Sequence, residues 1–436
     1  MRLSNRFPLA LTLLSVLLPS TASAQPPAAP LTWDNLAARL TAEAENGFTG
    51  AVLIVREGET VVDTGYGLAN RERGIPVTPE TIFATGSEPI DFTHVAILQL
   101  AQAGKLSLSD PITRFFDDVP ADKRAITVEH LMTGASGLQN FHDVPGDRDP
   151  DHSWIDRDEA MRRIFAQELL FAPGEGEEHS HSAWGVLAAI VEIAGGQSYQ
   201  DYTREHIYEP AGMVDTGFNG DPVPVERLAV GYGTRSDGTI NAPPYWGPTS
   251  WLVMGSGGQI STTGDTGRFY DALRENRLLE PEWTDRYFGD GVFGDRNGDV
   301  YGFEMFAYGS PRATTYAVLL TNANKPEPGH EDETPFVRVA RAVGDLVLRP
   351  YLPKYTFGIG FGRRPEGTVV DVVRPGSAAD RAGLREGDLL LAADGVPFGD
   401  DPMELLDPAV HSGDPVLFRV RRGDEELEIT VQPDPR

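Results

Sequence analysis

Ser87 stands just before an apolar stretch, residues 92–103, that is typical of a helix and stops at Gly104. A serine at a helix N-terminus can act as a nucleophile, because backbone N–H groups there can hold an oxyanion. The same position suits a simple N-cap, in which the hydroxyl accepts a hydrogen bond from the helix backbone. Pro89 fits the first helical turn under both interpretations. Position alone favours the cap.

A second polar segment holds Glu177, Glu178, His179 and His181. A His-x-His pair can supply two metal ligands and a carboxylate a third. A solvated acidic loop explains the same residues, and we expect no metal there. Residues 295–299 alternate like part of a calcium loop, but the later glycine and glutamate of that pattern are missing. We expect no cofactor.

The elements around these residues predict an α+β domain. Strand patterns lie at both ends of the first 350 residues, with helical patterns between them, so the terminal strands should meet in one sheet. The predicted strands are 50–56, 60–65 and 313–322, and the predicted helices are 33–44, 92–103, 183–194 and 335–348. A boundary is expected at 350–353. Beyond it lie predicted strands 369–373, 389–393, 416–420 and 427–431, and a helical segment, 377–382.

Segments in a fixed order resemble the serine β-lactamase and penicillin-binding-protein superfamily, in its class C and esterase-like branch. They are 82–87, 96–100, 104–112, 126–133, 136–138, 171–174, 196–218, 257–262 and 319–322. The resemblance covers about residues 32–350. It implies a β-lactamase-like antiparallel sheet flanked by an all-helical region, with Ser87 as the nucleophile of a serine hydrolase.

Several residues depart from the family pattern. The family uses Ser-x-x-Lys, with both side chains on one helix face, but Ile90 stands at the lysine position. Asp91 is about 100° further round the helix and should not replace the lysine. By the resemblance, the tyrosine of the Tyr-x-Asn motif falls on His179, which takes the proton-relay role. The asparagine falls on His181, which takes the substrate-contacting role.

Two more family positions are altered. The Gly-rich strand that carries a histidine or lysine aligns with residues 294–299, where only Arg296 could serve as the cation. Gly134 stands where the family has a histidine before Thr-Ser-Gly-Leu.

Two interpretations follow. One is a pseudoenzyme whose pocket binds a small ester, a peptide or a cell-wall fragment. The other is an esterase- or peptidase-type hydrolase in which His179 is the base for Ser87, since histidine is the ordinary base for a serine nucleophile. Glu177, Glu178 and Asp91 are then the candidates for a third member. β-Lactamase activity is not expected under either interpretation.

The C-terminal segment carries a second candidate site, the turn Phe357-Gly358-Ile359-Gly360-Phe361. Glycines there let backbone N–H groups converge on an anion such as a terminal carboxylate. Together with residues 369–396, this turn is similar to PDZ domains of bacterial envelope proteases, over about 351–436. The resemblance implies a β-rich domain that binds a peptide or protein C-terminus as an added strand. The alternative is a PDZ fold that only packs on the first domain.

The N-terminus predicts export. Arg2 and Arg6 precede an apolar run, residues 8–18, and the small-residue site Ala22-Ser23-Ala24. We expect residues 1–24 to be a cleaved signal peptide and 25–31 a linker. The run is too short to span a membrane, and without cysteine no lipid anchor is possible, so we expect no membrane anchor. The net charge of −28 disfavours nucleic acid as a partner. The predicted location is periplasmic or secreted.

Overall fold

The computed structural model describes residues 30–144, 153–232, 240–289, 293–309, 314–324, 334–351, 354–364, 366–399 and 402–435. The predicted signal peptide and most of the predicted linker lie outside these ranges.

The centre of the first domain is an antiparallel sheet with strand order β2-β1-β10-β9-β8. Its strands are β1 (Gly50–Arg56), β2 (Glu59–Tyr66), β8 (Phe293–Val300), β9 (Phe303–Gly309) and β10 (Tyr316–Thr321). β1 and β2 form the predicted hairpin, with Glu57 and Gly58 at φ 55° and 83° in its turn. β1 also pairs with β10, so the predicted meeting of the terminal strands is confirmed.

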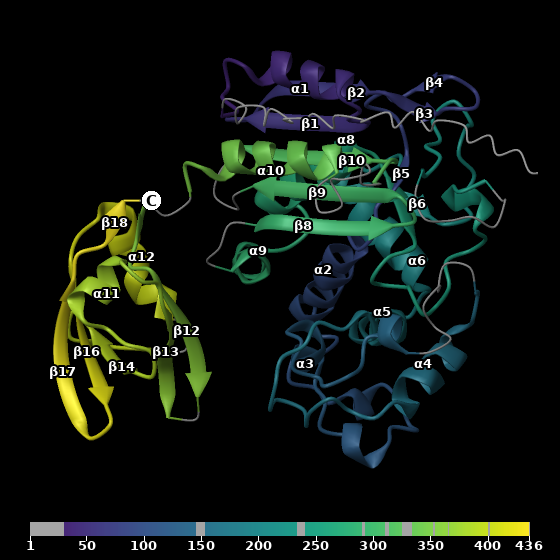
Figure 1. Ribbon diagram of the computed structural model, residues 1–436. Coiled ribbons are helices and arrows are strands. Elements are labelled where there is room, and N and C mark those ends of the chain that lie inside the picture. Colours follow the sequence, from purple (N-terminus) through teal and green to yellow (C-terminus); the bar gives the residue numbers. More distant parts are fainter. Residues whose placement is uncertain are drawn as a thin grey trace, which may run out of the picture.

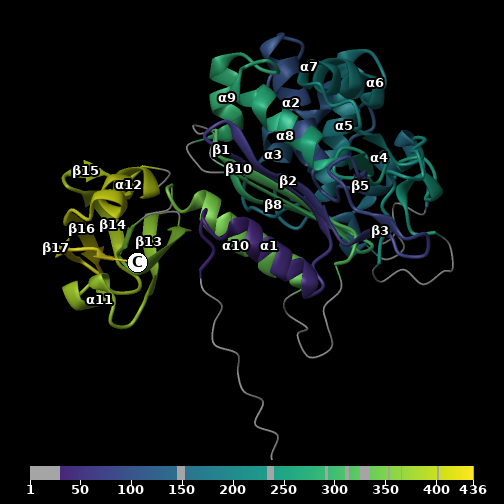
Figure 2. The same cartoon turned by 90° about the horizontal axis from the view of Figure 1, so that it is seen from above.

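Helices cover both faces of this sheet, as Figures 1 and 2 show. On β1, Val52 and Ile54 pack in the core with α1 (Leu36–Glu45) and α10 (Pro335–Leu348), while Leu53 and Val55 pack with the helical region on the other face. Successive side chains of a strand point to opposite faces. A strand covered on both sides is therefore apolar throughout, which is why β1 reads as a continuous apolar run.

The helical region follows β2 and returns before β8. Its helices are α2 (Pro89–Gln102), α3 (Val128–Met132), α4 (Arg157–Ala166), α5 (His181–Gly195), α6 (Tyr199–Thr203), α7 (Glu209–Ala211), α8 (Thr263–Arg274) and α9 (Pro281–Phe288). Short helical turns are η1 (Ile112–Arg114), η2 (Ala121–Lys123), η3 (Phe141–Asp143), η5 (Arg204–Tyr208) and η6 (Pro243–Tyr245). α2 and α5 carry mostly buried side chains and pack against each other.

Two small sheets complete the first domain. β3 (Leu68–Asn70) pairs with β4 (Ile75–Pro76), and β7 (Gln259–Ser261) lies between β5 (Phe83–Ala84) and β6 (Gly217–Phe218). The second of these sheets matters for function, because β5 leads directly into the turn that carries Ser87.

The C-terminal residues have a core of their own, yellow-green to yellow in Figure 1, built from side chains between Phe357 and Val431. The sheet order is β12-β13-β14-β16-β17, with β15 beside β14. The elements are β11 (Tyr355–Thr356), β12 (Ile359–Arg364), β13 (Gly367–Val373), α11 (Ala378–Ala382), β14 (Leu389–Ala393), β15 (Val396–Pro397), α12 (Pro402–Ser412), β16 (Val416–Arg422), β17 (Glu425–Val431) and β18 (Asp434–Pro435).

Candidate functional site

Ser87 lies in the turn between β5 and α2. β5 is held by pairing with β7, and the Thr85 N–H donates to the Gln259 carbonyl at 3.2 Å. Gly86 has φ 57°, and its carbonyl oxygen would lie 3.1 Å from a Cβ built on Gly257. Two glycines therefore let the turn and the 257 loop approach each other closely. The Ser87 side chain is half-buried beside them.

The Ser87 hydroxyl does not cap α2. The N-cap residue is Glu88, and no side chain caps this helix end. Within the described ranges, the Ser87 hydroxyl makes no hydrogen bond. The side chain is thus available for a ligand, unlike an N-cap serine.

Ile90 and Asp91 follow Ser87 on α2 and both have neighbours within the helical region. Ile90 is packed against the core of the helical region. Asp91 is 2% exposed, and the Tyr270 hydroxyl on α8 lies 3.0 Å from its Oδ2. The same hydroxyl lies 3.3 Å from Oε1 of Glu88, which is also 2% exposed. Asp91 is therefore turned into the protein towards α8.

His179 and His181 lie at the start of α5. Ser180 is the N-cap between them, and its Oγ accepts from the Ala183 N–H at 3.3 Å. His179 is exposed, His181 is half-buried, and their ring centroids are 5.0 Å apart. Burial, and then the neighbouring His142 and His179, lower the pKa of His181 to about 3. His181 is therefore uncharged at neutral pH and is a poor proton acceptor.

The helices that follow Ser87 and His179, α2 and α5, pack against each other. The ring of His94 on α2 lies 6.2 Å from that of Trp184 on α5. A Cβ on Gly255 would lie close to both Thr93 of α2 and Trp184 of α5. The backbone at Gly255 therefore packs closely against both helices. Ser87 and His179 each precede one of these helices. No hydrogen bond joins Ser87 to His179, although both residues are described.

The histidine segment is tied to the loop that carries Gly134. The Glu178 N–H donates to the Gly134 carbonyl at 3.0 Å, and the Gly174 N–H donates to that of Ala135 at 2.9 Å. Gly134 has φ 80°, and a Cβ there would approach the Glu178 carbonyl at 3.1 Å. A histidine at 134 would therefore be strained in this backbone. Glu177 and Glu178 are exposed, and their carboxylates have no partner in the described part of the chain.

The aligned Gly-rich stretch, residues 294–299, lies in β8, at the edge of the main sheet. Arg296 is opposite Ala307 of β9. The side chains of β8 lie outside the described part of the structure, so the predicted role of Arg296 stays a prediction.

The predicted carboxylate turn of the C-terminal domain leads into β12. Phe357 is buried against Phe418, with ring centroids 5.5 Å apart, and Gly358 has φ 75°. The Gly358 carbonyl accepts from the Arg374 N–H at 2.8 Å, which fastens the turn to the segment before α11. β12 pairs with β13, with an irregularity between Gly360 and Phe361. In the described sheet β12 is an edge strand, so its outer side is open to an added strand.

Comparison with known proteins decides the family. The family model described as beta-lactamase matches residues 34–342. The chain belongs to the beta-lactamase family. A model described as PDZ domain matches residues 369–431.

Individual relatives of the beta-lactamase-family domain are named for different activities. The putative penicillin-binding protein PbpX of Bacillus subtilis (strain 168) is 30% identical over 295 residues, which cover 64% of this chain and 71% of PbpX. Esterase EstB of Burkholderia gladioli is 36% identical over 234 residues, covering 49% of this chain and 59% of EstB. A D-amino acid amidase from Ochrobactrum anthropi SV3 has the same fold, with a TM-score of 0.59 at 23% identity, covering 71% of this chain and 95% of the amidase.

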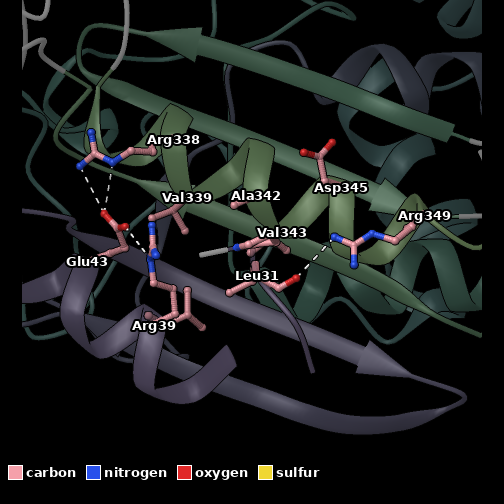
Figure 3. Close-up of a pocket in the computed structure, with 11 residues that line it drawn as sticks. Leu31, Arg39, Glu43, Arg338, Val339, Ala342, Val343, Asp345 and Arg349 are labelled. Carbon is pink, nitrogen blue, oxygen red and sulfur yellow. Dashed lines mark hydrogen bonds and ion pairs between the residues drawn. The ribbon is translucent and has the colours of Figure 1, made fainter. Parts of the chain in front are cut away.

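A cavity of about 190 Å³ lies away from Ser87, on the face of the beta-lactamase-family sheet that α1 and α10 cover (Figure 3). Glu43 of α1 bridges Arg39 at 2.9 Å and Arg338 of α10 at 3.2 Å along its wall. The Glu43 ion pairs at this cavity therefore link α1 to α10, and they are not part of the candidate site.

Two features are absent from the described ranges of the beta-lactamase-family chain. They hold no group of three or more His, Asp or Glu side chains placed to hold a metal ion. They also contain no helix with the length and apolar character to cross a membrane.

Sequence reasoning missed two groups of residues near Ser87 and His179. One is Glu88 with Tyr270, because nothing in the sequence relates α8 to the start of α2. The other is His142 in η3, whose ring lies 5.0 Å from that of His181.

Proposed function

We propose that the beta-lactamase-family domain binds its ligand without hydrolysing it. Ser87 is kept, but Ile90 stands one helical turn later, where the family resemblance calls for a lysine. An isoleucine can neither accept the serine proton nor stabilise an alkoxide. The apolar side chain at position 90 is the observation that carries this proposal. By analogy with relatives named as a penicillin-binding protein and an esterase, the ligand is a small ester, a peptide or a cell-wall fragment.

A second candidate is a serine hydrolase of the esterase or peptidase type, with His179 as the base. The available Ser87 hydroxyl and the exposed His179 favour it. Catalytic hydrogen bonds are often long before substrate binds, so a bond formed only in the complex would complete this pair.

For the C-terminal domain we propose binding of a peptide or protein C-terminus. The open edge of β12 would accept the peptide as a strand, and the N–H groups of the Phe357–Phe361 turn would hold its carboxylate. We also propose that residues 1–24 direct export and that residues 32–350 and 351–436 act as the two domains of a periplasmic or secreted protein.

Active-site labelling separates the two candidates for the first domain. Folded wild type should be labelled by neither a fluorophosphonate probe nor a fluorescent penicillin, because no group activates Ser87. A serine hydrolase in the same reaction gives the positive control. Fluorophosphonate labelling that is lost in both Ser87→Ala and His179→Ala would establish the second candidate instead.

Gly358→Ala should weaken the carboxylate turn. A Cβ at 358 would overlap the Cβ of Ser377, and the φ of 75° adds strain. Together we expect a cost of about 2–5 kcal/mol. Gly376→Ala is the matched control, because Gly376 has φ 76° but nothing within 4 Å of a Cβ. It should cost only about 1–2 kcal/mol.

The measurement is fluorescence anisotropy with a pooled library of peptides that have free C-termini, and with the same pool amidated. We expect wild type and Gly376→Ala to bind only the free carboxylates and Gly358→Ala to bind neither pool. Equal binding of amidated peptides would contradict carboxylate recognition.

A further inference from the structure

Three histidines meet at the start of α5, although the family resemblance accounts for only two of them. The ring centroid of His181 lies 5.0 Å from that of His142 and 5.0 Å from that of His179, with interplanar angles of 81° and 89°. His142 comes from η3, a separate segment of the chain. The rings are close, but the group is not placed to hold a metal ion.

The position of His142 is determined by its neighbours. Its backbone N–H donates to Oδ1 of Asn140 at 3.2 Å, which holds the turn of η3. Its ring lies 4.3 Å from that of Phe141, which is 1% exposed. The Phe141 ring also meets His181 edge-on at 5.7 Å. A buried phenylalanine therefore sets the spacing between the two imidazoles.

We propose that His142 is a positioning residue of the candidate site, which through its ring contacts with Phe141 and His181 holds the His181 imidazole in place at the start of α5. This proposal rests on the proposed function, because it takes His181 to be a residue that contacts the bound ligand. At position 181 the resemblance implies an asparagine that contacts substrate. An asparagine amide offers both hydrogen-bond donors and an acceptor, and a neutral imidazole also offers one donor and one acceptor. A charged imidazolium would offer donors only.

The physical reason is the unfavourable energy of a third positive charge at this place. Desolvation of the partly buried His181 disfavours its charged form most, and the neighbouring His142 and His179 oppose that charge further. His181 also begins a 15-residue helix, whose N-terminus is itself positive. The Phe141 ring, which also meets that of His181, carries no charge.

The test is an NMR titration of the full chain with ¹³C-labelled histidine, from pH 8 to the lowest pH at which the protein stays folded. His181→Gln identifies the His181 signal. In wild type that signal should not titrate above pH 5. His142→Phe keeps an aromatic ring on Phe141 but removes the charge, and it should raise the His181 midpoint by about one pH unit. His142→Lys keeps a positive charge and should not raise it.

Two outcomes would overturn the inference. One is a His181 midpoint between pH 6 and 7 in wild type. The other is the same rise, or no rise, in both His142→Phe and His142→Lys, because position 142 would then act only through packing or not at all. Fluorophosphonate labelling of wild type would overturn the proposed function and leave this titration standing, so the two failures are distinguishable.

Discussion

Replacing Arg422 by methionine is expected to speed hydrogen exchange in β14 and β16 of the PDZ domain by a factor on the order of 10²–10³. Arg422 holds the Asp388 carboxylate with two bonds of 2.7 Å, one to each oxygen, and Asp388 is fully buried. Removing one partner of such a pair leaves an uncompensated buried charge, at a cost of about 3–5 kcal/mol. Arg422 also donates to the Gly383 carbonyl at 2.8 Å, which adds to the loss.

Arg421→Met is the matched control for this variant. Arg421 is the preceding residue of the same strand and pairs with Glu426 at 2.9 Å, but both side chains of that pair are about half exposed. An exposed pair contributes only about 0–1 kcal/mol. Exchange measured by mass spectrometry on the full chain should therefore be nearly unchanged in Arg421→Met. Equal acceleration in both variants would show that the buried position of Asp388 does not matter.

The stability of the first domain should fall on acidification partly through His181. The folded-state pKa of His181 is lowered to about 3 from an ordinary 6.5, so the unfolded chain takes up this proton first as pH falls. The contribution of His181 is thus fully present above pH 6.5 and is lost between pH 6.5 and 3. Between pH 6.5 and 4.5 the loss should be about 2–3 kcal/mol.

Tryptophan fluorescence isolates this effect, because all six tryptophans lie between residues 33 and 283, outside the PDZ domain. Urea unfolding at pH 6.5 and 4.5 should show a smaller loss of stability in His181→Gln than in wild type. His206→Gln is the control, since that side chain is 42% exposed and the variant should lose stability as wild type does. An unchanged acid loss in His181→Gln would contradict the lowered pKa of His181.

Much of the fold could be predicted from local patterns. The strand at 50–56, the helix at 335–348 and the strand at 389–393 have the bounds that the structure shows for β1, α10 and β14. Apolar periodicity, a turn at Glu57-Gly58 and proline at a helix start are signals between near neighbours in the chain, and they act wherever the segment finally packs.

The sequence did not predict α12, because the predictions used only such local patterns. Pro408 lies inside it, and a proline removes one backbone hydrogen bond of a helix, so the local pattern does not favour a helix at 402–412. Side chains such as Leu406 and Val410, buried in the PDZ core, offset that cost through tertiary packing.

By itself the sequence determined which residue types are available for chemistry: Ser87 is present, Ile90 stands three residues after it, and two histidines lie at the start of α5. These facts depend only on spacing along one segment. Only the tertiary structure decided that Asp91 turns to Tyr270 on α8, and that His142 joins His181 from another segment. Such contacts depend on how whole helices pack together, and no periodicity within a single segment encodes which distant side chain will be the neighbour.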